Sequence, residues 1–415
     1  MRPAEVAARL AELGEAGAAL ARRPAPEIHA CLARVLDGWA DPGSAWRREL
    51  EARLPATTGF DPATLGEGLR RGFGCWSGRD LLELVRAELG DAEVSGFDTT
   101  AVLLAGQIPM PSLLALLAPL ALRSPVAVKP ASRDLVSPAL AARSIAETDA
   151  ELGRSVAVLE FPGDDEGCVR ALCGAGCVVA NGSDETLARV TARLAPGRRF
   201  VGYGHRVSVA AVGAGARGAG LEAAARELAL DVALWDQLGC LSPIAAYAAG
   251  GAGPAAELAE ALADALAGLA TRLPRGAIDA VAAARVASER AEAEMRAAAG
   301  RPVALRAGAG TSWTVVREED ARLRPAPLYR FVRVHPVADE ADLLDALRPL
   351  ARHLAGVGIA GFGDRTPEVA RALAALGASR VCPLGRLQSP PLAWPRDGRP
   401  VLLPLARLAS LESGG

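Results

Sequence analysis

The sequence predicts an α/β fold built on an open, mostly parallel sheet, and three observations carry that prediction. Short runs of purely apolar residues recur along the chain, as in 101–106, 125–129 and 177–180. Segments with helical spacing separate these runs. The chain has 415 residues, of which 51% are hydrophobic, enough for one large core or two domains. Strands that are apolar on both faces are typical of a parallel sheet covered by helices.

The first predicted sheet follows an N-terminal helical region. Its elements are a strand at 101–106, a loop at 107–111, a helix from Ser112, a strand at 125–129, a helix over 137–152, a strand at 155–161, a helix over 166–174, a strand at 177–180, a turn at 181–184, a helix over 185–194 and a strand at 199–202. Repeated strand–helix units of this kind predict an open α/β domain of the dinucleotide-binding type.

One cysteine stands in the most distinctive segment of the chain, Asp236-Gln237-Leu238-Gly239-Cys240-Leu241-Ser242-Pro243. Ser242 as an N-cap and Pro243 at the first helical position predict a helix over 242–249. The positive end of that helix would favour the Cys240 thiolate, so Cys240 is predicted to be a nucleophile. The alternative is a small buried residue at a junction between elements.

Further elements surround Cys240 in the second half of the chain. Helices are predicted over 220–233, 254–273 and 277–300, and strands within 307–316 and 328–334. The whole chain is therefore predicted to have four parts: an N-terminal helical region (1–95), a dinucleotide-binding domain (96–215), a catalytic domain with the cysteine (216–385) and a closing segment (386–415).

Charge and cysteine usage exclude several classes of protein. Lys and Arg number 46 against 48 Asp and Glu, with no block of like charge, so a nucleic-acid-binding protein is not predicted. Seven scattered cysteines argue against a disulfide framework and predict a reducing, cytoplasmic location. The spacing of Cys168, Cys173 and Cys177 matches no zinc site.

No membrane-spanning or targeting segment is predicted. The N-terminus lacks the apolar region of a signal peptide. The uncharged run 101–122 is interrupted by Gln107 and three prolines, so it is not predicted to span a membrane.

Residues at strand ends suggest where a ligand could bind. Lys129 ends a predicted strand, where open α/β sheets bind ligands, although it could equally be a solvated lysine. No Gly-x-Gly-x-x-Gly motif opens the first strand–helix unit, so an ordinary Rossmann site is not predicted. The turn with Gly182 and Ser183 could face a phosphate at a helix N-terminus, or could be a plain helix cap.

Six segments, taken in order, resemble the acyl-CoA reductases of the LuxC type, a branch of the aldehyde dehydrogenase superfamily. The resemblance extends from about Gly96 to the end of the chain. The segments are Gly106-Gln107-Ile108-Pro109, Val128-Lys129-Pro130, Gly182-Ser183-Asp184-Glu185-Thr186, Gly202-Tyr203-Gly204-His205-Arg206-Val207-Ser208, Gln237–Pro243 and Gly385-Arg386-Leu387-Gln388-Ser389-Pro390-Pro391. The resemblance implies an aldehyde dehydrogenase-like fold, with an open α/β cofactor domain followed by an α/β catalytic domain.

The resemblance also implies roles for individual residues. Cys240 matches the nucleophile that attacks the acyl thioester. Gln107 stands where the superfamily has its oxyanion-hole asparagine, and its longer carboxamide can still donate to an oxyanion. Lys129 matches the lysine that holds the adenosine ribose, and Gly182 with Ser183 matches the pyrophosphate turn.

Two departures from the superfamily pattern bear on the reaction. Gly202 replaces the glutamate that activates the deacylating water in oxidising members, so an acyl-enzyme should survive to accept a hydride. His205 is then the candidate acid or base, with a structural role as the alternative. Ser132 and Arg133 follow Lys129 and suit a 2′-phosphate, which favours NADPH over NADH. Alternatively, Arg133 pairs with Asp134 or with solvent.

The predicted function is NADPH-dependent reduction of an acyl thioester, acyl-CoA or acyl-protein, to the aldehyde through an S-acyl intermediate on Cys240. Two enzymatic alternatives are a semialdehyde dehydrogenase and an acyl-phosphate reductase. A third alternative is a non-catalytic subunit that carries an acyl group. An acyl-transferring protein partner and a homo-oligomer are expected by analogy with the superfamily, and segment 388–395 is expected to make a docking or subunit contact.

Overall fold

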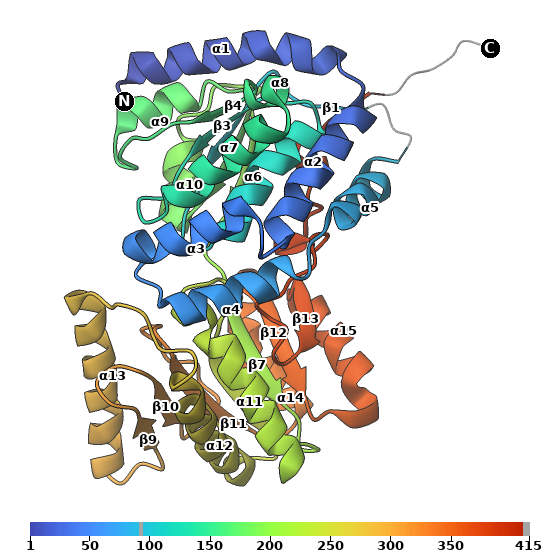
Figure 1. Ribbon diagram of the computed structural model, residues 1–415. Coiled ribbons are helices and arrows are strands. Elements are labelled where there is room, and N and C mark those ends of the chain that lie inside the picture. The colour runs from blue at the N-terminus through green and yellow to red at the C-terminus, as the bar shows by residue number, and fades with distance from the viewer. Residues whose placement is uncertain (91–93, 410–415) are drawn as a thin grey trace. The chain divides into compact units, whose positions relative to one another are not determined.

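The computed structural model describes residues 1–90 and 94–409, and the chain forms two compact units. The first unit comprises Met1–Thr58, Gly72–His205 and Pro391–Gly415, and the second comprises Gly59–Arg71 and Arg206–Pro390. Figure 1 shows their helices and strands. Each unit is built on a mainly parallel sheet with helices packed against it, so the predicted α/β class is confirmed.

The sheet of the first unit has five strands in the order β4-β3-β2-β5-β6. They are β2 (Thr100–Leu103), β3 (Val126–Lys129), β4 (Val156–Val158), β5 (Cys177–Asn181) and β6 (Arg199–Tyr203). All four pairings are parallel. The carboxyl ends of the strands therefore share one edge, and the predicted strands of this half are confirmed.

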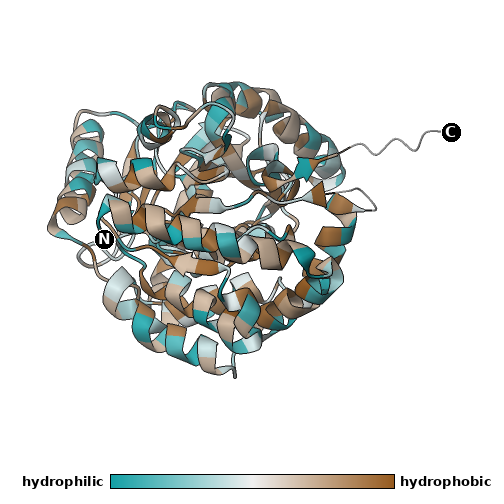
Figure 2. Cartoon of the chain, turned by 90° about the horizontal axis from the view of Figure 1, so that it is seen from above, coloured by the Kyte–Doolittle hydropathy of each residue, from teal (hydrophilic) through white to brown (hydrophobic). Residues whose placement is uncertain are grey.

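Helices pack against this sheet or against the helices that lie on it. They are α1 (Pro3–Arg22), α2 (Ala25–Ala40), α3 (Ala45–Thr58), α5 (Gly78–Leu89), α6 (Pro109–Ala121), α7 (Val136–Thr148), α8 (Ala150–Gly153), α9 (Glu166–Leu172) and α10 (Asp184–Thr191), and α4 (Pro62–Phe73) straddles the boundary between the units. Val6 and Leu13 of α1 share a core with Ala101 of β2. Cys168 and Cys173 lie in that same core, which gives these thiols a packing role. Figure 2 shows the hydrophobic and hydrophilic residues that alternate along such helices.

The C-terminal segment returns to the first unit. β1 (Val94–Ser95) pairs with β14 (Arg407–Leu408) in an antiparallel ladder. Two short turns, η4 (Arg396–Gly398) and η5 (Leu403–Leu405), precede β14. The carboxylate of Glu88 accepts backbone N–H bonds from Val401 at 2.7 Å, Leu402 at 2.7 Å and Leu403 at 3.1 Å.

The sheet of the second unit has seven strands in the order β13-β12-β7-β8-β11-β10-β9. They are β7 (Val207–Val212), β8 (Pro243–Ala249), β9 (Ala304–Ala307), β10 (Thr314–Arg317), β11 (Phe331–Val337), β12 (Leu354–Ala360) and β13 (Arg380–Pro383). Only the pairing of β9 with β10 is antiparallel. The predicted strands within 307–316 and 328–334 correspond to β10 and β11.

Helices also cover the second sheet. They are α11 (Ala219–Ala233), α12 (Ala252–Ala270), α13 (Ala280–Ala298), α14 (Glu340–Leu347) and α15 (Thr366–Leu376), with the short turns η1 (Leu234–Gln237), η2 (Arg348–His353) and η3 (Gly363–Arg365). Leu343 of α14 and Leu373 of α15 share a core with Tyr247 of β8 and Val357 of β12. The three helices predicted around Cys240 are confirmed as α11, α12 and α13.

The helix predicted over 242–249 is wrong, because this segment is strand β8. β8 lies between β7 and β11 and pairs with both in parallel. Ala245, Ala246 and Tyr247 have no exposed surface. A short run of small apolar residues fits a fully buried strand as well as a helix, so its periodicity does not discriminate between them. Pairing with two neighbouring strands decides the outcome.

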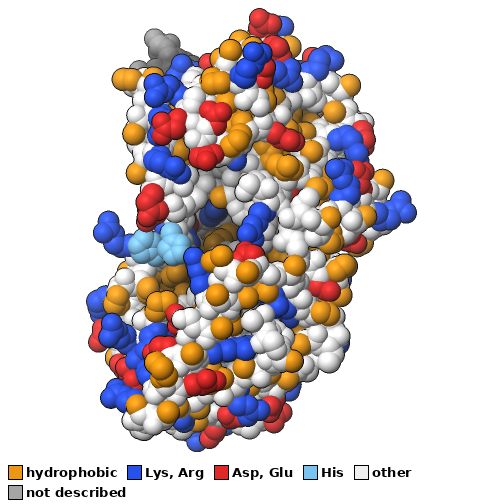
Figure 3. All heavy atoms as spheres, turned by 90° about the vertical axis from the view of Figure 1, so that its left-hand side faces the viewer, with side chains coloured by type: hydrophobic (Ala, Val, Ile, Leu, Met, Phe, Trp, Pro, Cys, Tyr) orange, Lys and Arg blue, Asp and Glu red, His pale blue; other side chains and the backbone are white. Residues whose placement is uncertain are grey.

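In the part of the chain that the structure describes, no helix is long and apolar enough to cross a membrane. The uncharged run 101–122 is divided between β2 and α6. On the face of the molecule in Figure 3, Lys and Arg side chains are interspersed with Asp and Glu.

Candidate functional site

Lys129 lies at the carboxyl end of β3 with a largely desolvated ammonium group. Its side chain is 7% exposed. Burial lowers the pKa of Lys129, and the charge of Asp164 acts in the opposite direction. Gly163 lies beside it, and a Cβ added there would stand 3.5 Å from Nζ. A cation at this edge of a parallel sheet is placed where open α/β folds bind ligands.

The turn after β5 places Gly182 and Ser183 on the same edge. Ser183 is the N-cap of α10, and its Oγ accepts the N–H of Thr186 at 3.3 Å. A Cβ on Gly182 would stand 3.0 Å from the Thr186 side chain, so the position is tight. Ser183 is therefore a helix cap, as one of the two sequence interpretations predicted. The Ser183 hydroxyl also lies 3.2 Å from Thr186 Oγ1 and hydrogen-bonds to the Glu185 carboxylate, so a phosphate would have to displace these contacts.

Ser132 and Arg133 form the exposed tip of a turn that follows β3. Ala131 and Asp134 bridge across it, and the Asp134 N–H donates to the Ala131 carbonyl at 3.1 Å. Asp134 is only 2% exposed, and it accepts the N–H of Ser137 at 2.8 Å. Burial raises the pKa of Asp134. Asp134 thus serves the start of α7, while both candidate phosphate ligands reach solvent.

Gln107 occupies the loop between β2 and α6. Gly106 before it has φ of +84°, a conformation that favours glycine. The Gln107 side chain is 6% exposed, and its Oε1 is buried with no hydrogen-bond partner among the described residues. This amide oxygen is one of twelve buried side-chain atoms without a partner among the described residues, so its burial alone does not mark a site.

His205 follows β6, and its side chain is exposed. Its backbone N–H donates to Asp184 at 3.2 Å. Two residues before His205, the guanidinium of Arg396 stacks over the Tyr203 ring, 4.4 Å from the ring centre. Arg399 donates to the carbonyl of Gly202 at 3.0 Å. The sequence did not reveal these contacts, because the two arginines come from the closing segment almost two hundred residues later.

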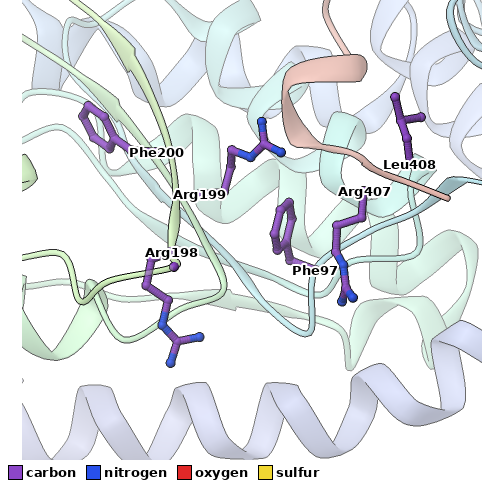
Figure 4. Close-up of a pocket in the computed structure, with 7 residues that line it drawn as sticks. Phe97, Arg198, Arg199, Phe200, Arg407 and Leu408 are labelled. Carbon is purple, nitrogen blue, oxygen red and sulfur yellow. The ribbon is translucent and has the colours of Figure 1, made fainter.

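The hollow in Figure 4 is a different feature of the first unit. Its volume is about 460 Å³, and it is lined by Phe97, Gly197, Arg198, Arg199, Phe200, Arg407 and Leu408. Arg199 begins β6. The hollow therefore lies at the amino ends of the strands, and Lys129 and Gly182 lie at the carboxyl ends.

Cys240 belongs to the second unit, where its side chain is exposed on the loop between η1 and β8. Trp235, Asp236 and Gln237 come just before it with φ of 57°, 49° and 65°. Left-handed conformations are costly for residues with a Cβ and persist only when the surroundings hold them. Because β8 replaces the predicted helix, no helix N-terminus follows Cys240 to stabilise its thiolate.

A buried ion pair holds this left-handed turn. The Asp236 carboxylate accepts from Arg330 Nη2 at 2.7 Å and Nε at 3.0 Å. Arg330 ends a second left-handed run, Leu328 to Arg330, with φ between 57° and 67°. Its guanidinium also donates to the carbonyl of Leu273 at 2.7 Å. The two strained turns thus support each other.

Gln237 connects the same turn to two strands. Its Nε2 donates to the carbonyls of Pro243 at 2.8 Å and Phe331 at 2.9 Å, and its Oε1 accepts the Phe331 N–H at 2.8 Å. The backbone carbonyl of Cys240 accepts from Ser208 Oγ at 2.7 Å. The backbone on both sides of the cysteine is therefore fixed, while the thiol is exposed. Asp236 and Gln237 are polar residues beside an apolar run, which is the one sequence feature that could have suggested these roles.

Comparisons with known proteins agree with this architecture. A family model described as Acyl-CoA reductase (LuxC) matches residues 20–410. No curated protein matches the chain. Among solved structures, an oxidoreductase from Marinobacter aquaeolei has a TM-score of 0.74 and 16% identity, over 98% of this chain and 90% of that one.

Two further solved structures show the same fold. P. syringae AldA indole-3-acetaldehyde dehydrogenase, a mutant in complex with NAD+ and IAA, has a TM-score of 0.77 and 16% identity, over 99% of this chain and 89% of that one. An NAD-dependent benzaldehyde dehydrogenase from Corynebacterium glutamicum has a TM-score of 0.70 and 16% identity, over 92% and 86%.

The fold is that of the aldehyde dehydrogenases, as the sequence resemblance implied. Within that class the chain belongs to the acyl-CoA reductase (LuxC) family, so it is an oxidoreductase that acts on acyl or aldehyde groups.

The buried ion pair of Asp236 and Arg330 leads to a prediction about stability. Asp236→Asn should lower the free energy of unfolding of the second unit by about 3–5 kcal/mol, because it leaves Arg330 buried without a counter-charge. Urea unfolding followed by hydrogen exchange in β8 and β11 measures this. Glu222→Gln, which removes an exposed pair with Arg226 at 3.7 Å, should change it by less than about 1 kcal/mol. Equal stability of both variants would refute the role of the pair.

Proposed function

We propose that the protein reduces an acyl thioester to the aldehyde, with Cys240 as the nucleophile and NADPH as the hydride donor. The observation that supports this most directly is the exposed Cys240 thiol on a loop held by Ser208 and Gln237, in a chain of the acyl-CoA reductase family. An exposed thiol on a rigid backbone is suited to covalent catalysis, because the attacking atom is accessible and its position is defined.

The first proposed step is acylation of Cys240. Its thiolate attacks the carbonyl carbon of an acyl-CoA or acyl-protein thioester, and the carbonyl electrons move to oxygen. The oxyanion collapses, the donor leaves as its thiolate, and the acyl group remains on Cys240 Sγ. Gln107 is proposed to donate its side-chain N–H to the oxyanion.

The carboxyl edge of the first sheet fits a nicotinamide dinucleotide. Lys129 offers a cation whose pKa is lowered by burial, beside the backbone of Gly163, and Gly182 with Ser183 precedes the N-terminus of α10. Arg133 and Ser132 are proposed to hold the 2′-phosphate. When bound, NADPH supplies the hydride that reduces the acyl carbon, after which the Cys240 thiolate leaves and the aldehyde is released.

Gly202 and His205 are proposed to determine the fate of the acyl group. Gly202 has no side chain that could activate water, so hydrolysis to the acid should be slow. His205, exposed at the end of β6, is proposed as the acid or base for the proton transfers. An acyl-transferring protein partner and a homo-oligomer stay predictions.

The nucleophile is tested first. Cys240→Ala should lower NADPH oxidation with a panel of acyl-CoAs by at least about 10³-fold, because no S-acyl intermediate can form. Aldehyde trapping identifies the product. Cys75→Ala, which removes a half-buried thiol of the first unit, is the control and should keep full activity. Turnover of acyl phosphates alone would point to an acyl-phosphate reductase, and acylation of Cys240 without NADPH binding to an acyl-carrying subunit.

The cofactor preference is tested at the turn after β3. Arg133→Glu should raise the KM for NADPH at least about tenfold and leave the KM for NADH nearly unchanged, because a carboxylate repels the 2′-phosphate. Arg198→Glu makes the same charge reversal at the opposite edge of the sheet and should leave both constants unchanged. An unchanged KM for NADPH in Arg133→Glu would rule out this role.

The oxyanion donor is tested by shortening Gln107. Gln107→Ala should lower kcat by about 10²–10³-fold with little change in the KM for NADPH, because only the transition state loses a hydrogen bond. Gln107→Asn retains a donor and should recover part of kcat. Equal activity of the wild type and the alanine variant would exclude the assignment.

A further inference from the structure

Asp231, near the end of α11, holds the turn that follows β13. The side chain has no exposed surface. Its Oδ2 accepts the backbone N–H of Gly385 at 2.7 Å, and its Oδ1 accepts that of Leu387 at 3.1 Å. Both carboxylate oxygens are therefore occupied by backbone donors 154 and 156 residues further along the chain.

Gln388 continues this turn toward the cysteine loop. It is 4% exposed, and its Nε2 donates to the carbonyl of Asp231 at 3.1 Å and to Ser242 Oγ at 3.2 Å. Ser242 lies two residues after Cys240, and its N–H donates to the carbonyl of Gly239 at 3.0 Å. Gln388 is thus hydrogen-bonded to the short turn that carries the Cys240 thiol. Gln388 itself is bound within its own unit, and the docking or subunit contact expected for segment 388–395 stays a prediction.

The other side of the cysteine is anchored separately. Ser208 Oγ donates to the Cys240 carbonyl at 2.7 Å and accepts the Gly356 N–H at 3.0 Å. Ser208 and Gly356 belong to β7 and β12, which are paired in the middle of the sheet. Gln237 also holds the carbonyl of Pro243, so the Ser242 side chain is the point at which the segment held by Asp231 reaches this loop.

We propose that Asp231 and Gln388 are positioning residues for Cys240, and that they hold its loop in the reactive geometry only while the Asp231 carboxylate is ionised. This inference deepens the proposed function and rests on it for the role of Cys240 as nucleophile. The carboxylate interacts with three backbone N–H groups of the turn, those of Gly385, Leu387 and Gln388. A protonated carboxyl is a weaker acceptor than a carboxylate, and its added hydrogen faces N–H donors instead of an acceptor. Protonation therefore weakens the hold of Asp231 on this turn.

The ionisation of Asp231 falls in the range where enzymes work. Burial raises the pKa of Asp231 to about 7, and the N–H bonds from the Gly385–Gln388 turn lower it. Loss of these bonds while Asp231 stays buried raises the pKa further, so protonation favours the open turn over the closed one. The charge of Glu227, one turn earlier on α11, raises this pKa further. The other ionisable groups near the turn are Cys382 and Arg380 of β13 and Arg386, and burial raises the pKa of the Cys382 thiol to about 11.

Glu227 offers a way to move this titration without removing a hydrogen-bond partner of Asp231. Its side chain is exposed but packs against Gly385, so the isosteric Glu227→Gln is used to keep that contact while removing the charge. Glu227→Gln should shift the titration of Asp231 to lower pH, because a like charge is removed. Glu222→Gln, on the same helix and also exposed, is the matched control because Glu222 lies nine residues before Asp231 on α11, whereas Glu227 lies four residues before it.

Hydrogen exchange tests the inference without any substrate. Protection factors in peptides that cover 384–390 and 238–244 should fall in the full-length wild type as the pH drops through about 7, after correction for intrinsic exchange. Asp231→Asn should show low protection at all pH values, because its amide nitrogen cannot accept. Glu227→Gln should move the transition to lower pH, and Glu222→Gln should leave it in place.

The acyl-CoA reaction tests the functional consequence. The wild-type kcat should fall about tenfold from pH 8 to pH 6 as Asp231 gains its proton. Asp231→Asn and Gln388→Ala should lower kcat at pH 8 about tenfold or more and leave the KM for NADPH unchanged. Glu227→Gln should move the pH profile of kcat in the same direction as the exchange transition.

Two outcomes would overturn the inference. One is that Glu227→Gln leaves the pH of the exchange transition or of the kcat profile unchanged. This test does not depend on whether Asp231→Asn folds. The other is a folded Asp231→Asn that keeps the wild-type transition. If no acyl-CoA is turned over but the exchange transition depends on Asp231, the proposed function fails while the positioning role stands. If turnover depends on Cys240 but neither profile depends on Asp231, the inference alone fails.

Discussion

The buried ion pair of Asp236 and Arg330 fixes the part of the molecule on which the proposed chemistry depends. Each residue lies in a run of three residues with positive φ, and such conformations cost about 1–2 kcal/mol per residue when a Cβ is present. The pair joins the two runs at 2.7 Å. Because Asp236 is held there, the adjacent Gln237 reaches the carbonyls of Pro243 and Phe331.

The two sides of the cysteine loop differ in their chemistry. On the upstream side the buried Asp236 carboxylate faces the guanidinium of Arg330, which stays charged and opposes the rise in the Asp236 pKa that burial causes. On the downstream side Gln388 reaches Ser242 from a turn held by Asp231, a carboxylate without such a counter-charge whose pKa burial raises to about 7. The exposed thiol of Cys240 thus lies between a turn held by the Asp236–Arg330 pair and a hydrogen bond from Gln388 whose support, in our proposal, depends on the ionisation of Asp231.

The cofactor half depends on a different constraint, the parallel order of its five strands. Parallel pairing brings the carboxyl ends of β3 and β5 to one edge, so Lys129 and Gly182 share that edge although they are distant in the chain. The same rule places the arginine-lined hollow at the other edge. The edge that carries a lysine with a lowered pKa and a tight glycine turn is the one suited to a dinucleotide.

Local pattern was enough to predict most elements of this chain, because apolar runs and helical spacing reflect burial directly. It also predicted Lys129 at a strand end and singled out Cys240. Contacts between distant residues decided the rest. Segment 242–249 is a strand because β7 and β11 pair with it, although its alanines favour a helix when considered alone. The partners of Asp236 and Asp231 lie 40 to 156 residues away, and only the folded backbone brings such donors to a buried carboxylate.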